Sequence, residues 1–205
     1  PYTVEESEII IIPVDSDITC SYSKGTSEGP KAILEASTQL DFYSPYLKNA
    51  WQTKVAMLAL DETKNKENKR VGEKASGLIK KLEKGFALNE KDKETYNEVN
   101  QHCEQINLAV EKEAKKNLEQ GKKVCVLGGD HCSPLGLIWA LSKKHKNFGI
   151  LQIDAHADLR KAYEGFEYSH GSIMYNALKS TSVSKLVQIG VRDICPEEMK
   201  LINNS

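Results

Sequence analysis

Histidine and aspartate residues gather at two points of the chain, each directly after an apolar run. The run at residues 122–129 (KKVCVLGG) is followed by an Asp-His pair, and the run at residues 148–154 (FGILQID) opens an Asp-x-His-x-Asp pattern. The residues are Asp130, His131, Asp154, His156 and Asp158. Only five histidines occur in the whole chain, so two of them in this small set make it the densest group of potential ligands.

The spacing of Asp154, His156 and Asp158 has a physical meaning. In an extended segment, side chains at positions i, i+2 and i+4 point the same way, so one strand end can present carboxylate, imidazole and carboxylate together. His131 at a neighbouring strand end can close on the same point. Carboxylate and imidazole without thiolate suit a hard or borderline divalent ion. Because a carboxylate can bridge two ions, the pattern is also compatible with a two-metal site.

Each of these residues also has an ordinary structural interpretation. Asp130 precedes a helix-like run, so a turn or cap role is expected for it. His170 also precedes such a run, and its intrinsic pKa would suit proton transfer, although a simple hydrogen-bonding role is the stronger interpretation from the residues alone. Cys132 is expected to be a small core residue. His102 and His145 are expected on helix surfaces.

The elements that must position these residues follow from the apolar pattern. Continuous apolar runs of strand length are typical of strands buried on both faces of a parallel sheet. These runs lie at residues 7–14, 54–60, 122–129, 148–154 and 185–191. Helical patterns lie between them, at residues 29–37, 91–120, 133–145 and 170–180, with Gly121 as a stop. Alternating strands and helices predict an α/β fold with a parallel sheet between helices.

Two segments are less regular. Residues 61–94 are rich in Lys and Glu, which predicts a solvated helix, a helical pair or a loop, and no specific role follows from the composition. After the run at 185–191, a helix is expected to begin at Pro196, and the chain then stops. That ending predicts either a small fold or the N-terminal portion of a longer one.

Length and composition set outer limits. With 205 residues and a formal net charge of −1, residues 1–205 are expected to form a single domain with no nucleic-acid or membrane-surface partner. The first residues carry three Glu and no basic region, unlike a secretory signal, and the apolar runs are too short to cross a bilayer. Five cysteines without a paired spacing favour free thiols and a cytoplasmic location.

Three ordered motifs resemble the ureohydrolase family of arginases and agmatinases. They are GGDHCSPLG (128–136), IDAHADLR (153–160) and YSHGSIMYNA (168–177). The stretch at residues 13–44 and QIGVRD (188–193) are similar to the agmatinase branch. The resemblance runs from about residue 8 to residue 195 and is weakest at residues 61–94.

The resemblance implies a three-layer α-β-α fold with a mainly parallel sheet and two Mn²⁺ ions at its carboxyl edge. Carried over by motif, His131 would bind one ion, His156 would bind the other, and Asp154 would bridge both. Asp158 would bind the same ion as His131, and His170 would be the catalytic proton shuttle. No substrate-binding residue can be assigned, and self-association into a homo-oligomer is expected by analogy with the family.

The implied reaction is hydrolysis of a small guanidino substrate. A metal-bridging hydroxide would attack the guanidinium carbon, and His170 would protonate the leaving amine, releasing urea and an amine. The YSHG form resembles agmatinases rather than arginases, which favours agmatine. Guanidinobutyrate and formiminoglutamate remain alternatives within the same family.

Two departures from the family pattern matter. Cys132 stands where the family has Ser, a change expected to be tolerated. The family's later SxDxDxxDP segment, whose two Asp complete both metal shells, is absent between Asp193 and Ser205. Four ligands remain where two metals need about six with shared carboxylates. The fold is therefore expected to be incomplete at its C-terminal end, with an open sheet edge. The alternatives are an inactive protein of the same fold and a metal-dependent deacylase of related fold.

Overall fold

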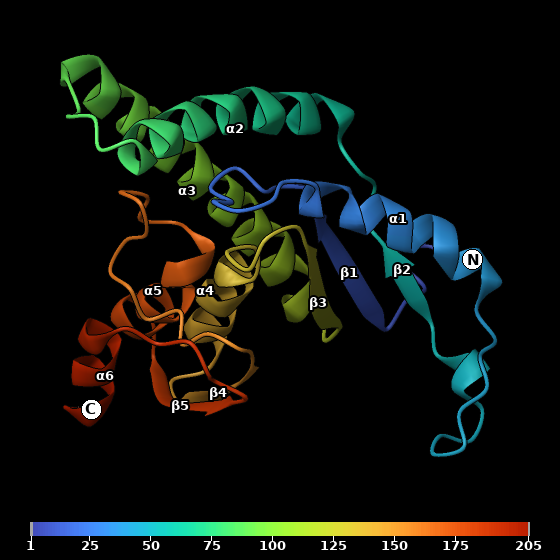
Figure 1. Cartoon of the computed structure of the whole chain (residues 1–205). Coiled ribbons are helices and arrows are strands. Elements are labelled where there is room, and N and C mark those ends of the chain that lie inside the picture. Colours follow the sequence, from blue (N-terminus) through green and yellow to red (C-terminus); the bar gives the residue numbers. More distant parts are fainter. Residues whose placement is uncertain (1, 205) are drawn as a thin grey trace.

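The computed structural model describes residues 2–204 as parallel strands surrounded by helices (Figure 1). The strands are β1 (Ile9–Val14), β2 (Val55–Met57), β3 (Lys123–Gly128), β4 (Phe148–Ile153) and β5 (Val183–Ile189). The helices are α1 (Gly29–Ala36), α2 (Glu62–Glu83), α3 (Glu90–Glu119), α4 (Leu135–Lys144), α5 (Ile173–Ser180) and α6 (Pro196–Asn203). All five predicted strands, the four predicted helices and the helix beginning at Pro196 are therefore confirmed, and the predicted three-layer α/β class holds.

The strands form two parallel sheets. One has the order β2-β1-β3, and the other pairs β4 with β5. Among the described residues no ladder joins β3 to β4, so each of these strands has one open edge. The sequence predicted an open edge at the C-terminal end of the fold. That edge is present on β5, which pairs only with β4 among the described residues. Open edges also occur on β3 and β4 in the middle of the fold, because these two strands, consecutive in the chain, are not neighbours in one sheet.

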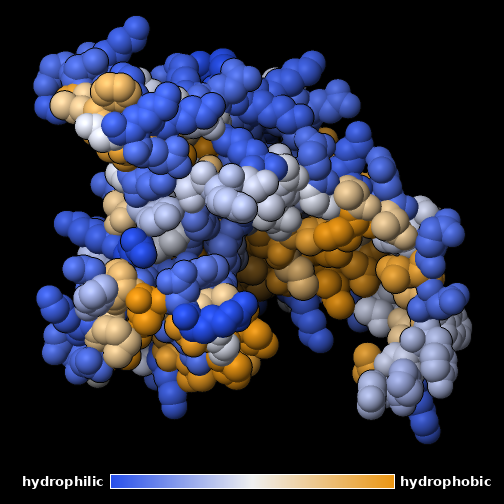
Figure 2. Space-filling view, viewed as in Figure 1, coloured by the Kyte–Doolittle hydropathy of each residue, from blue (hydrophilic) through white to orange (hydrophobic). Residues whose placement is uncertain are grey.

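An apolar face accompanies this division. Leu151 and Ile153 on β4 pair in register with Val187 and Ile189 on β5, and all four side chains are exposed. Figure 2 shows apolar surface both here and in the hollow beside the sheet that contains β1. Within residues 2–204 this face has no covering element.

The hydrophobic core lies where the helices pack against the strands, away from this exposed apolar face. The side chains of Ile10, Ile12 and Val14 on β1 are buried against Val110 and Ala114 of α3. A second cluster, which includes Ile138 and Met174, joins α4 and α5 to the sheet of β4 and β5. These contacts fix the ends of β3 and β4, which carry the predicted ligands.

The charged segment at residues 61–94 is a helical hairpin. Helix α2 begins after Asp61, whose carboxylate accepts hydrogen bonds from the N–H groups of Thr63 and Lys64. Its apolar stripe, which includes Val71 and Leu78, packs against α3. Of the three predicted possibilities, the helical pair is therefore right, and the charges lie on its outer faces. No helix among the described residues is long and apolar enough to span a bilayer.

Candidate metal centre

The loop that carries His131 is tied to the end of β1. Gly129 has a φ of 33°, and a Cβ atom there would lie 2.2 Å from the carbonyl oxygen of Ser16, so only glycine fits. The next residue, Asp130, donates its backbone N–H to the same Ser16 oxygen at 2.9 Å. The close approach of these two strand ends fixes where the His131 side chain begins.

Asp130 itself has the predicted turn role. One of its carboxylate oxygens accepts the N–H of Cys132 at 2.9 Å, and its carbonyl accepts the hydroxyl of Ser133. Its side chain is buried, and this burial raises the pKa of the carboxyl. Burial also raises the pKa of the Cys132 thiol well above its usual range. Cys132 is half-buried in this tight turn, less buried than the predicted core residue, and its raised pKa disfavours the reactive thiolate.

The Asp154–Asp158 segment follows β4 but is not extended throughout. Asp158 has a φ of 54°, in the left-handed region, so the predicted strand-like alternation is wrong at this residue. The conformation is held from outside. The carbonyl oxygen of Asp158 accepts the N–H groups of Met174 and Tyr175 at 3.0 and 3.3 Å. A turn anchored on the start of α5, and not alternation, brings the Asp158 carboxylate back toward Asp154.

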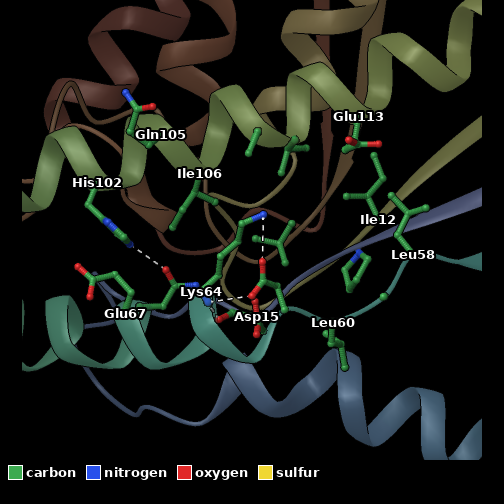
Figure 3. Close-up of a pocket in the computed structure, with 17 residues that line it drawn as sticks. Ile12, Asp15, Leu58, Leu60, Lys64, Glu67, His102, Gln105, Ile106 and Glu113 are labelled. Carbon is green, nitrogen blue, oxygen red and sulfur yellow. Dashed lines mark hydrogen bonds and ion pairs between the residues drawn. The ribbon is translucent and has the colours of Figure 1, made fainter.

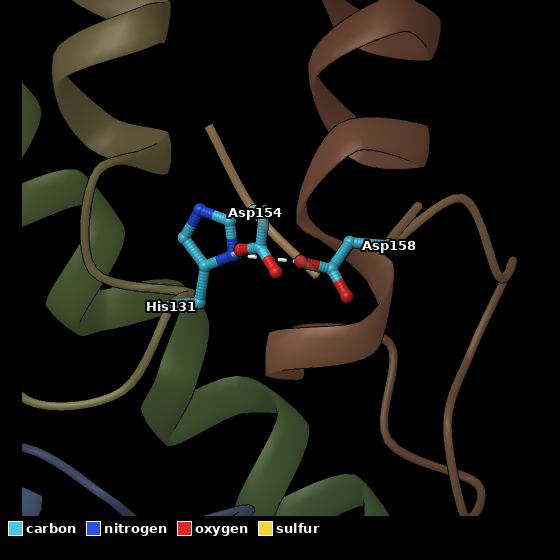
Figure 4. A group of neighbouring side chains, drawn as sticks. All are labelled: His131, Asp154 and Asp158. Atoms are coloured by element: carbon cyan, nitrogen blue, oxygen red, sulfur yellow. Dashed lines mark hydrogen bonds and ion pairs between the residues drawn. The ribbon is translucent and has the colours of Figure 1, made fainter. Parts of the chain in front are cut away.

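Three side chains converge at this point (Figure 4). The Nδ1 atom of His131 lies 2.7 Å from Oδ2 of Asp158 and 3.1 Å from Oδ2 of Asp154. One ligand atom from each of the three residues falls within 4.8 Å of the others. Asp158 is buried, and the other two are partly exposed, so the cluster is reachable from solvent. Two carboxylate oxygens and an imidazole nitrogen form a donor set suited to a hard or borderline divalent ion.

The electrostatics of the cluster favour a cation. Burial opposes protonation of His131, but the hydrogen bond and charge of Asp158, together with the charge of Asp154, outweigh it and raise the pKa of the imidazole. Burial likewise opposes ionisation of Asp154. The N–H of His156 and the positive charge of His131 outweigh that effect and lower the pKa of the Asp154 carboxyl. Two carboxylate groups that converge on one imidazole, with the pKa of Asp154 lowered, fit a site that a metal ion can occupy in place of a proton.

His156 lies near the second carboxylate oxygen of Asp154, the one that His131 does not contact. Its Nδ1 atom lies 3.3 Å from Oδ1 of Asp154, whereas His131 faces Oδ2. The His156 side chain is 59% exposed and is not within the group formed by His131, Asp154 and Asp158. The two oxygens of one carboxylate therefore face two different histidines, an arrangement in which Asp154 can link two ligand positions.

His170 lies in a short 3₁₀ segment, His170–Ser172, just before α5. Its ring meets the Tyr163 ring edge to face, with centroids 5.2 Å apart, and Ser169 Oγ lies 3.5 Å from its Nδ1 atom. It is not within the three-residue group of His131, Asp154 and Asp158. The ring is half-buried beside a tyrosine, and its catalytic role stays a prediction.

Sequence reasoning missed three residues that support this site. Glu198, buried on α6, accepts the N–H of Leu159 at 2.9 Å and the N–H of Cys195 at 2.9 Å. Gln152 and Gln188 pair across β4 and β5 directly beneath the Asp158 turn. The available signal was the glutamine inside the otherwise apolar strand β4, because a buried amide needs partners. Gln188 gave a weaker signal, since β5 also contains Ser184 and Lys185.

A separate cavity of about 270 Å³ lies between β1, α2 and α3 (Figure 3). Its walls include Ile12 and Ile106, and its rim carries Asp15, Glu67 and His102. The Nε2 atom of His102 lies 2.8 Å from Oδ1 of Asn68. The prediction that His102 is a simple surface residue is therefore wrong, because its ring is half-buried and hydrogen-bonded between two helices.

Fold and site together define an α/β protein with a candidate divalent-metal centre at the carboxyl ends of parallel strands. The family model described as "Arginase family" matches residues 7–205. The chain therefore belongs to the arginase family.

Individual relatives agree. An N(1)-aminopropylagmatine ureohydrolase from Thermus thermophilus is 30% identical over 201 residues, which are 98% of this chain and 56% of that protein. An agmatinase from Bacillus anthracis is 30% identical over 196 residues, covering 96% of this chain and 56% of the relative. The agmatine ureohydrolase of Thermoplasma volcanium has a similar fold, with a TM-score of 0.70 at 22% identity, covering 97% of this chain and 55% of that one. The chain thus spans about half the length of the relatives it matches.

Proposed function

We propose that this chain contributes to a manganese-dependent ureohydrolase that acts on a small guanidino compound, with agmatine favoured. The observation that carries the proposal is the placement of Asp154. Its two oxygens face His131 and His156 separately, while Asp158 closes on His131. His131, Asp154 and Asp158 would hold one ion, and Asp154 with His156 would hold part of a second.

Metal ions held there would supply an activated water at neutral pH and would polarise the guanidino group. The residues of this chain then have separate tasks. Asp154 and Asp158 offset the charge of the ions, so that a cationic substrate is tolerated nearby. His170, half-buried and in contact with Tyr163, would carry a proton to the leaving amine.

The choice of substrate rests on the relatives and on the motif at residues 168–177. Two of the similar proteins carry the names agmatinase and N(1)-aminopropylagmatine ureohydrolase. Guanidinobutyrate and formiminoglutamate hydrolysis are the alternatives within the family, and an inactive protein of the same fold is the alternative outside it. A cytoplasmic location and a homo-oligomer are part of the same proposal.

The first test concerns the coding sequence after Ser205 and the activity it encodes. We expect the 205-residue chain to bind Mn²⁺ weakly without releasing urea, because four ligands cannot complete two metal shells. We expect the protein extended by its own downstream sequence, with an Asp-x-Asp-x-x-Asp-Pro segment, to release urea from agmatine.

Parallel assays with guanidinobutyrate, formiminoglutamate and arginine set the substrate. Faster turnover of guanidinobutyrate would move the assignment to that alternative. Rapid urea release by the 205-residue chain would contradict the four-ligand argument. A downstream sequence without the Asp pair, together with no urea from any substrate, would contradict the enzymatic proposal.

A further inference from the structure

Two glutamines, one buried and one half-buried, connect the sheet of β4 and β5 to the metal cluster. Gln152 on β4 is 4% exposed, within a strand whose other side chains are apolar apart from Gly149. Its Nε2 atom lies 3.4 Å from Oδ2 of Asp158 and 3.3 Å from the carbonyl oxygen of His156. Gln188, its register partner on β5, donates from Nε2 to Oε1 of Gln152 at 2.6 Å.

The direction of these hydrogen bonds is fixed by groups that can only accept. The carbonyl oxygen of Ala157 accepts from Gln188 at 2.7 Å, so Gln188 must present its NH₂ group on this side. The carbonyl oxygen of His156 likewise requires the NH₂ group of Gln152. Each amide therefore has a single orientation, and the NH₂ group of Gln152 faces the carboxylate of Asp158.

The Asp158 turn needs such support. A non-glycine residue at a φ of 54° is a strained position that persists only where the surroundings hold it. The backbone is held by α5 and by Glu198, as described above. Among the described residues, two side chains form hydrogen bonds with the Asp158 carboxylate, those of His131 and Gln152. Of these, only Gln152 lies outside the cluster that would bind the metal.

The geometry points to Gln152 as a positioning residue for the metal centre, with Gln188 fixing the orientation of its amide. Gln152 holds the Asp158 carboxylate toward His131 before a metal arrives, and Gln188 prevents the Gln152 amide from turning its oxygen toward that carboxylate. The inference rests on the proposed function, because it assumes that Asp158 is a metal ligand. It adds Gln152, which lies outside the motifs of the resemblance, and it gives a role to Gln188, the first residue of QIGVRD (188–193).

The test replaces each glutamine by methionine, which has a similar length but cannot donate a hydrogen bond. Three variants of the 205-residue chain are compared with the unmodified chain: Gln152→Met, Gln188→Met and the control Gln105→Met on the exposed side of α3. The probes are Mn²⁺ alone, titrated by the loss of its free-ion electron paramagnetic resonance signal, and Co²⁺ alone, followed by its visible absorption spectrum. Urea unfolding of the metal-free proteins reports stability separately.

We expect Gln152→Met to weaken Mn²⁺ binding by about 10- to 100-fold, the range typical of lost outer-shell partners. Gln188→Met should weaken it less, by a few-fold, because Gln152 remains but can rotate. Both variants should alter the Co²⁺ spectrum, which depends on ligand geometry and not on overall stability. Gln105→Met should change neither the affinity nor the spectrum.

If Gln152→Met does not fold, Gln188→Met carries the test, since its side chain is only half-buried. Unchanged Mn²⁺ affinity and Co²⁺ spectra in the folded glutamine variants, beside clear binding by the unmodified chain, would overturn the positioning role and leave the proposed function standing. No binding of either ion by the unmodified chain would overturn the metal centre itself, and the positioning role with it.

Discussion

Two half-buried histidines, one in the metal cluster and one in the α2–α3 hairpin, have opposite environments. His131 lies between two carboxylates, and their charges raise the pKa of its imidazole despite burial. His102 lies beside the cavity between α2 and α3, where burial lowers the pKa of its imidazole although Glu67 and Glu98 oppose the effect. The charged imidazolium is thus favoured at His131 and disfavoured at His102. Residue type and burial therefore do not identify a metal ligand, whereas converging carboxylates do.

The two regions also differ in what holds them together. The hairpin is held by packing, with Leu78 and Val99 among its buried residues. The cluster is held by hydrogen bonds to backbone groups and by a strained turn at Asp158. Changes in the hairpin should therefore affect stability, and changes in the cluster should affect metal affinity.

The largest effect on stability is expected from Leu78→Ala. This side chain is 3% exposed between α2 and α3, and its truncation leaves a cavity that costs about 2–5 kcal/mol of unfolding free energy. Urea unfolding measures the loss. Leu82→Ala, one turn further along α2 and 36% exposed, is the matched control and should cost much less. A changed Mn²⁺ affinity in folded Leu78→Ala protein would contradict the separation of the two regions.

The largest effect on metal binding is expected from Asp154→Asn. The change removes a charge and the carboxylate whose two oxygens face His131 and His156. Mn²⁺ affinity should fall by more than about 100-fold, or about 2.7 kcal/mol, because a direct ligand matters more than its outer-shell partners. Mn²⁺ titration measures the fall. Asp15→Asn is the control, since Asp15 is a carboxylate at the rim of the other cavity. Equal losses in both variants would show that general charge, and not this cluster, attracts the ion.

The sequence predicted most of this fold, and the physical reasons are local. Continuous apolar runs predicted all five strands, and the helical pattern at residues 91–120 predicted α3 with its stop at Gly121. The local sequence pattern could not predict that the strands divide into two sheets. Strand order depends on which edges meet in space, and a parallel strand carries no signal for its neighbour.

The candidate site was predicted in part for a similar reason. His131, Asp154 and Asp158 were chosen by type and position, and they do converge. The predicted cause, extended alternation, was wrong, because the left-handed turn at Asp158 depends on contacts with α5 that lie far along the chain. Gln152 and Glu198 were missed, since a supporting residue is defined by its partners and not by its type.

The smallest effect concerns His102 and depends on pH. Because the pKa of His102 is lowered in the folded chain, the unfolded chain takes up a proton first as the pH falls. Its contribution to stability is therefore complete above the unfolded pKa of about 6.5 and is lost as the pH falls below that value. His102→Gln can still donate to Asn68 but cannot titrate, so its stability should fall less than that of the unmodified chain between pH 7 and pH 5. His145→Gln, at an exposed position that ends α4, is the control. Urea unfolding across this pH range gives the difference between each variant and the unmodified chain. If stability changed with pH equally in His102→Gln and in the unmodified chain, burial beside the α2–α3 cavity would not lower the pKa of His102. The contrast with His131 would then depend only on the carboxylates around His131.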